Sequence, residues 1–89
     1  MDPIAKKTQI LLEWNGWTKS TKALYHPEYG ETNLLSAVLA ACEYNIDDYK
    51  KYCLLLCETL GVKSVIDIVK WETRHDRTVD DLNKLLQKL

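Results

Sequence analysis

The sequence predicts an all-α fold, a compact bundle of about five short helices with one long irregular loop over residues 17–31. Two observations predict the helices: apolar residues recur at helical spacing along most of the chain, and residues that favour helix starts precede several of these stretches. A third observation predicts the loop, because residues 17–31 have no helical period and contain His26-Pro27 and Gly30.

The first helix is expected to begin at Asp2-Pro3. The Asp2 side chain can accept the free amide hydrogens of a first turn, and Pro3 has no amide hydrogen to leave unpaired. Asn15-Gly16 is expected to end this helix, since both residues tolerate positive φ. Helical spacing places on one side Ile4, Thr8, Leu11 and Leu12, and Trp14 can extend that side.

The loop over residues 17–31 is long for a connection inside a small domain, so we expect it either to have a function or to be held by packing. Pro27 favours an extended conformation for His26. Aromatic and apolar residues in this loop are the expected packing contacts: Trp17, Leu24, Tyr25 and Tyr29.

Two central helices are expected next. The first, from near Thr32 to about Tyr44, is apolar nearly all round and must be buried. Asn45-Ile46-Asp47 is expected to form a corner, and Asp47 to cap the next helix, which stops at Gly61. Its inward side is predicted to hold Tyr49, Tyr52, Cys53, Leu56 and Leu60.

The last two helices each follow a capping pattern. Ser64-x-x-Asp67 precedes a stretch rich in β-branched residues, and Thr78-x-x-Asp81 precedes a strongly amphipathic one. In the corner between them, we expect Trp71 to pack the two helices together, Thr78 to cap the fifth helix and Arg77 to fold back on the Trp ring or on nearby carbonyls. The alternative is a corner that exposes His75 and Arg77 as a binding edge.

The composition excludes several classes of function. The chain has 89 residues, enough for one domain, 46% of them hydrophobic. Twelve basic and 13 acidic residues give a net charge of −1, which disfavours both a nucleic-acid binder and a DNA mimic. The longest apolar runs, such as residues 54–57, are too short to cross a membrane, and residues 1–4 lack the features of a secretory signal. We therefore expect a cytoplasmic protein.

The sequence favours neither an enzyme nor a cofactor or metal site. Cys42, Cys53 and Cys57 lie in apolar helical stretches and are expected to be free thiols. Cys53 and Cys57 share a helix face, but a metal site would need ligands from unrelated places. Two pairs of residues could supply a nucleophile with its base: Cys42 with His26, and Ser36 with His75. No local motif supports either pair.

One alternative class is a nucleic-acid accessory protein. Basic residues interleaved with aromatic ones can bind a single strand by phosphate pairing and stacking. The residues concerned are Lys6, Lys7, Lys19 and Lys22 with Trp14 and Trp17, and the acids that dilute this patch are Glu13, Glu28 and Glu31.

Two segments carry a family resemblance. The C-terminal one comprises residues 64–68, Trp71-Glu72-Thr73, Arg77-Thr78, Leu82 and Leu85-Leu86, and the upstream one comprises Gly16-Trp17 with residues 33–37. They resemble a family of small uncharacterised actinobacterial and bacteriophage domains that have a Gly-Trp motif and a C-terminal W-N-D-x-x-x-R-T motif. Glu72-Thr73 replaces the Asn-Asp pair of that family, and Asn33 and Ser36 replace its Cys and Gly. The resemblance implies a helical fold and a bacterial or phage setting, and it brings no activity.

The leading hypothesis is therefore a small protein-binding module of unknown target, which the resemblance extends to a phage-encoded modulator of a host protein or defence system. The alternatives are the nucleic-acid accessory protein and, behind it, a minor enzyme or metal site. Self-association stays open, because a small chain gains core by pairing. The candidate binding residues are Trp17, Tyr25, His26, Tyr29, His75 and Arg77.

Overall fold

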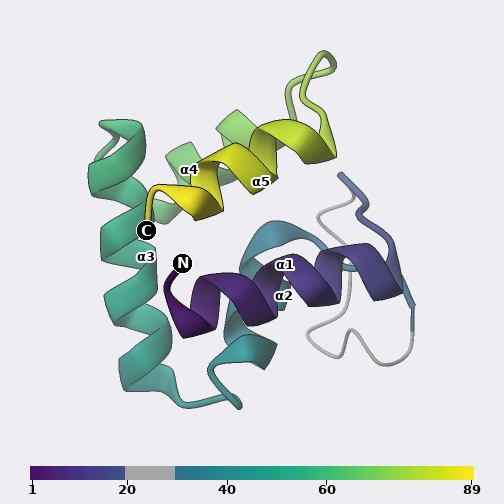
Figure 1. Ribbon diagram of the computed structural model, residues 1–89. Helices are drawn as coiled ribbons and strands as arrows, with labels where there is room; N and C mark the ends of the chain where they lie inside the picture. The colour runs from purple at the N-terminus through teal and green to yellow at the C-terminus, as the bar shows by residue number, and fades with distance from the viewer. Residues whose placement is uncertain (20–29) are drawn as a thin grey trace.

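The computed structural model describes residues 1–19 and 30–89, and the expected packing and binding residues Leu24, Tyr25, His26 and Tyr29 lie outside this part of the chain. Within it, the protein is an all-helical compact globule with five helices and no strand, as the sequence predicts (Figure 1). The helices are α1 (Pro3–Asn15), α2 (Leu34–Ala41), α3 (Ile46–Leu60), α4 (Val65–Glu72) and α5 (Val79–Gln87).

The predicted ends of α1 are confirmed. The Asp2 carboxylate accepts hydrogen bonds from the amides of Ile4 and Ala5 at 2.9 and 3.1 Å, and Gly16 ends the helix with φ at 84°. Asp2 also accepts a hydrogen bond from the Tyr52 hydroxyl at 2.8 Å, which ties the start of α1 to α3. Burial and the bond to Asp2 raise the pKa of Tyr52 to about 12.

The expected cap of α3 is wrong by two residues. Asn45 has an extended backbone, and its side chain accepts the amide hydrogen of Asp48 at 3.0 Å. Asp47 already lies in the first helical turn, where its charge complements the helix dipole but its side chain caps nothing. The predicted end of α3 at Gly61 is confirmed, with φ at 71°.

Helix α2 is shorter than expected and ends in a strained turn. Glu43 and Tyr44 have φ values of 54° and 61°, which residues other than glycine seldom adopt. The amide of Tyr44 donates to the Leu39 carbonyl and that of Glu43 to the Ala40 carbonyl, the pattern of a Schellman cap. The left-handed turn thus satisfies the last carbonyls of α2 without a glycine.

Carboxylates in the first turn explain the starts of α4 and α5, and at α5 the capping is reciprocal. The Asp67 carboxylate accepts hydrogen bonds from the Ser64 amide and hydroxyl, both at 3.2 Å. The Asp81 carboxylate accepts from the Thr78 amide at 3.0 Å, and the Asp81 amide donates to the Thr78 hydroxyl at 3.3 Å. Both predicted helix starts are confirmed, including the one before β-branched residues.

Every helix contributes to one core. Helix α1 packs against α2 and α5, and α3 packs against α2, α4 and α5 along one side of the bundle (Figure 1). The largest fully buried apolar side chains come from all five helices: Leu12, Leu34, Val38, Leu56, Ile68, Leu82 and Leu86. Among the described residues, no helix is long and apolar enough to cross a membrane.

Candidate protein-binding site

Trp17 lies just beyond α1, where the chain turns back towards α2. The amide of Thr18 donates to the Thr32 carbonyl at 3.0 Å, and the amide of Thr32 donates to the Gly16 carbonyl at 2.9 Å. These bonds form an isolated parallel bridge between Trp17 and Thr32. The two described ends of the segment expected to be a loop therefore lie side by side.

A buried carboxylate holds Trp17 in place. Glu72, the last residue of α4, has only 3% of its surface exposed. Its Oε2 atom accepts hydrogen bonds from the Trp17 indole Nε1 and from the Leu34 amide, both at 2.7 Å. The Leu34 amide is the first of α2 and has no acceptor within its own helix. Glu72 thus joins the start of α2, the residue after α1 and the end of α4.

Burial raises the pKa of Glu72 above its ordinary value of 4.5, although the bonds from Trp17 and Leu34 act in the opposite direction. Both donors contact the same oxygen, so a proton can reside on Oε1 while Oε2 keeps both hydrogen bonds. We refer to Glu72, Trp17 and Leu34 as the Glu72 junction.

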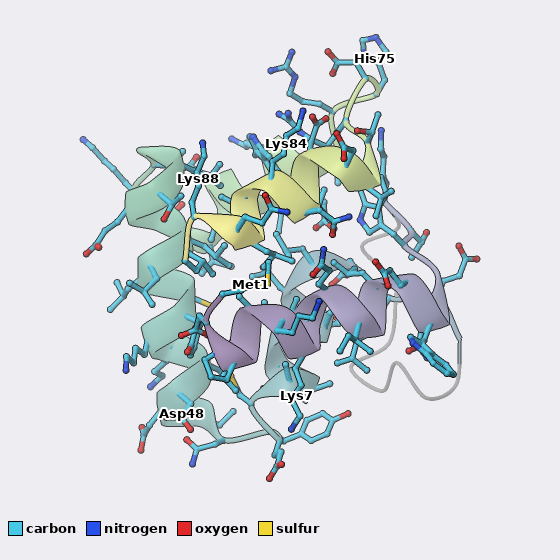
Figure 2. All side chains as sticks on the ribbon, in the orientation of Figure 1. Met1, Lys7, Asp48, His75, Lys84 and Lys88 are labelled. Carbon is cyan, nitrogen blue, oxygen red and sulfur yellow. The ribbon has the colours of Figure 1, made fainter. Side chains whose placement is uncertain are left out.

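The corner between α4 and α5 is held by Arg77. Its guanidinium carbon lies 4.0 Å from the centroid of the Trp71 ring, and its Nε donates to the Trp71 carbonyl at 2.9 Å. Its Nη1 lies 3.8 Å from Asp81. These contacts stabilise the corner, and Thr78 caps α5. His75 is exposed at the far tip of the corner, away from the other helices (Figure 2).

Two lysines of the expected basic patch, Lys7 and Lys19, contact other described parts of the chain. Lys19 donates to the backbone carbonyls of Arg74 and His75, and its Nζ lies 5.6 Å from the centroid of the Trp17 ring. Lys7 forms an ion pair with Glu43. Lys22 lies outside the described residues.

Trp14 does not face the core, although helical spacing allows it to. Its side chain is 85% exposed, whereas Leu12 is buried and Leu11 packs against the core. At about 100° per residue, Trp14 lies almost opposite Leu12 around the helix, so the two cannot face the same core. The expected extension of the inward side to Trp14 is therefore wrong.

Trp14 lines an open groove of about 630 Å³ between α1 and the end of α2. Lys7, Ile10, Leu11 and Asn15 of α1 line it as well, with Ala40, Ala41 and Tyr44 on the side of α2. We refer to it as the α1–α2 groove. The ion pair between Lys7 and Glu43, at 3.2 Å, joins α1 to the strained turn at one end of the groove.

A second groove, of about 360 Å³, lies between α3 and the start of α4. Its apolar lining includes Leu54, Val65 and the buried thiols of Cys53 and Cys57, and its charged lining residues are two lysines, Lys50 and Lys63. Burial raises the pKa of both thiols, which makes them poor nucleophiles at neutral pH.

The other predicted chemical residues lie apart in the fold. Ser36 is buried in α2, whereas His75 is exposed in the corner after α4. Cys42 is buried at the end of α2, and its predicted partner His26 is outside the described residues. Within residues 1–19 and 30–89, no group of three or more His, Cys, Asp or Glu side chains is arranged to hold a metal ion.

No protein-family model, curated protein or solved structure matches this chain. The resemblance to the actinobacterial and bacteriophage domains, with the bacterial or phage setting it implies, stays a prediction.

Proposed function

We propose that this protein is a protein-binding module and that it binds through the α1–α2 groove. The observation that carries the proposal is the 85% exposure of Trp14 at the edge of an apolar groove. Burying a tryptophan removes roughly 150–250 Å² from water, which at about 25 cal/mol per Å² is worth roughly 4–6 kcal/mol. The single chain leaves most of this free energy unused.

The surroundings of Trp14 support a binding role, because Trp14 belongs to an apolar patch and is not a single exposed residue. Single exposed apolar side chains are common on protein surfaces, whereas contiguous apolar patches mark interaction sites. Ile10 and Tyr44, both about 40% exposed, border the same groove as Trp14. Tryptophan and tyrosine are the residue types that most often dominate binding free energies at protein interfaces.

Backbone strain at the edge of the groove gives further support. Two consecutive left-handed residues, Glu43 and Tyr44, cost on the order of 1–2 kcal/mol each. Such strain is often found at functional sites. Here it places Glu43 beside Lys7 and Tyr44 in the groove lining.

The experiment compares two exposed residues of similar character. Tagged wild-type protein, Trp14→Ala and the control Leu54→Ala, 66% exposed on α3, are each expressed in the native host beside an untagged copy. Recovered proteins are identified by mass. We expect wild type and Leu54→Ala to recover the same partner, whether the untagged copy or another protein, and Trp14→Ala to lose it. Equal recovery of the partner by the wild type and both variants would contradict the proposal.

A further inference from the structure

The α1 side of the groove has an ordered arrangement of side chains. Lys7, Ile10, Leu11 and Trp14 follow one another at i, i+3, i+4 and i+7, so they form a single stripe along α1. With a rise of about 1.5 Å per residue, this stripe is about 10 Å long. A cation stands at one end, an aromatic ring at the other and two aliphatic side chains between them. Figure 2 shows Lys7 on the side of α1 that faces away from α5.

This order makes the stripe complementary to itself. If two α1 helices pack antiparallel about a twofold axis between Ile10 and Leu11, Lys7 of each copy comes opposite Trp14 of the other. An ammonium group over an indole ring is a favourable cation–π pair, and the aliphatic side chains meet in the middle. A twofold interface needs such a self-complementary patch, because every contact occurs twice. If one residue contacts a second residue across the axis, the second residue of the first copy also contacts the first residue of the other copy.

The rest of the groove leaves room for this pairing. Its α2 side contributes Ala40 and Ala41, whose small side chains allow close approach. A closed cavity of about 150 Å³ already holds a benzene molecule, so an open groove of about 630 Å³ can accept an indole ring. At the end near Lys7, Glu43 of the same copy lies 3.2 Å from the Lys7 ammonium, so each copy brings a neutralised charge to this end of the groove.

The second groove, between α3 and the start of α4, is not self-complementary in this way. Its charged lining residues, Lys50 and Lys63, have the same sign, and a twofold contact there would bring lysines together. Like charges across an interface oppose association. The charge pattern thus separates the two grooves and favours the one that contains Trp14 for pairing of identical chains.

We propose that two copies of this chain bind each other through their α1–α2 grooves, with Trp14 of each copy against Lys7 of the other. The inference rests on the proposed function, since it names the partner of the same groove. It is a more specific statement, because a groove that binds a different protein would satisfy the proposed function alone.

The test is sedimentation equilibrium of the full chain over a wide range of concentrations, with expected masses of 10.3 kDa for one copy and twice that for the pair. We expect a concentration-dependent pair that Trp14→Ala weakens roughly 30-fold or more. Lys7→Ala removes both of the twofold-related cation–π pairs, each worth about 0.5–1 kcal/mol when exposed, so it should weaken the association roughly 5- to 30-fold. Lys50→Ala, in the other groove, should leave it unchanged.

A cysteine at the proposed axis tests the register. Ile10→Cys should form a disulfide between two copies under mild oxidation, whereas Leu54→Cys should not. A chain that stays single at every concentration would overturn the pairing. A pair that Trp14→Ala leaves intact, or that Ile10→Cys fails to cross-link, would overturn its location. If the chain stays single but recovers another protein through Trp14, the proposed function survives and this inference fails.

Discussion

Trp14 and Trp17 stand three residues apart in the sequence and have opposite environments in the fold. Trp17 is half-buried, and its indole Nε1 donates to a buried carboxylate at 2.7 Å, whereas Trp14 is 85% exposed in an open groove. The comparison separates two uses of one residue type: Trp17 stabilises the fold, and Trp14 is available to a partner. Aromatic content alone does not distinguish them, because the distinction depends on burial and on the partner of the indole N–H.

Glu72→Ala should have the largest effect on the stabilising role of Trp17. It leaves the Trp17 indole and the Leu34 amide without their acceptor, each at a cost of about 1–3 kcal/mol. The substitution also removes a buried charge, and this gain offsets part of the cost of the two lost hydrogen bonds. We therefore expect the free energy of unfolding to fall by about 2–4 kcal/mol. Urea unfolding followed by circular dichroism measures this.

Glu72→Gln is the matched control. The glutamine side-chain oxygen can accept both hydrogen bonds without a buried charge, so this variant should keep most of the wild-type stability. Equal losses for Glu72→Ala and Glu72→Gln would show that the charge, and not the acceptor, is what matters at this position.

Trp17→Phe is the next largest change. It keeps an aromatic ring and removes the indole donor, so we expect a loss of about 1–2 kcal/mol in the free energy of unfolding. In a background of Glu72→Ala, the same substitution should cost much less, because its acceptor is already gone. Additive losses in this double-mutant cycle would contradict a shared junction.

The pH dependence of stability also tests the role of Glu72. The folded protein keeps a proton on Glu72 to higher pH than the unfolded chain does, because burial raises the pKa above 4.5. The stability from this proton is fully present below pH 4.5 and is lost as the pH rises through the raised pKa. Thermal unfolding at a series of pH values should show this loss in the wild type and not in Glu72→Gln.

At lower pH the sign reverses. Burial opposes ionisation of Asp2, but hydrogen bonds from Tyr52, Ala5 and Ile4 outweigh it and lower the pKa below 3.8. The amide of Thr78 lowers the pKa of Asp81 below 3.8 as well. Both groups contribute stability above that pH and lose it as the pH falls through their lowered values, so stability should decline again in acid.

The strained turn beside Trp14 gives a smaller expected effect of opposite sign. Glu43→Gly relieves the left-handed backbone and removes only an exposed ion pair with Lys7. The gain in the free energy of unfolding should be up to about 1 kcal/mol, since glycine adopts this conformation freely but has more freedom in the unfolded chain. A loss of stability would show that the ion pair outweighs the strain.

The helices were predictable because their signals are local. Asp2, Ser64 and Thr78 stand next to the turns that they start, and Gly16 and Gly61 end helices because they adopt positive φ. The end of α2 was harder, because Glu43 and Tyr44 adopt that conformation without a glycine. The cap of α3 was misplaced because Asn45 and Asp47 are both good capping residues two positions apart.

The candidate site could not be predicted, because it depends on distant contacts. Glu72 and Trp17 are 55 residues apart, and nothing near Glu72 in the sequence marks it as buried. Trp14 stands three residues from Leu11, and this spacing is compatible both with a side chain that faces the core and with one that lines a groove. The order of Lys7, Ile10, Leu11 and Trp14 was readable as a stripe, but only the position of α2 shows that the stripe borders a groove.

The most direct test of the contrast between the two tryptophans is sedimentation equilibrium of Trp14→Ala beside Trp17→Phe, with thermal unfolding as the check on folding. We expect Trp14→Ala to change the free energy of unfolding of the single chain by less than about 0.5 kcal/mol, as for an exposed site, and to weaken the pair roughly 30-fold or more. Trp17→Phe should keep the pair and lose stability. A Trp14→Ala protein that associates as the wild type does would contradict the account.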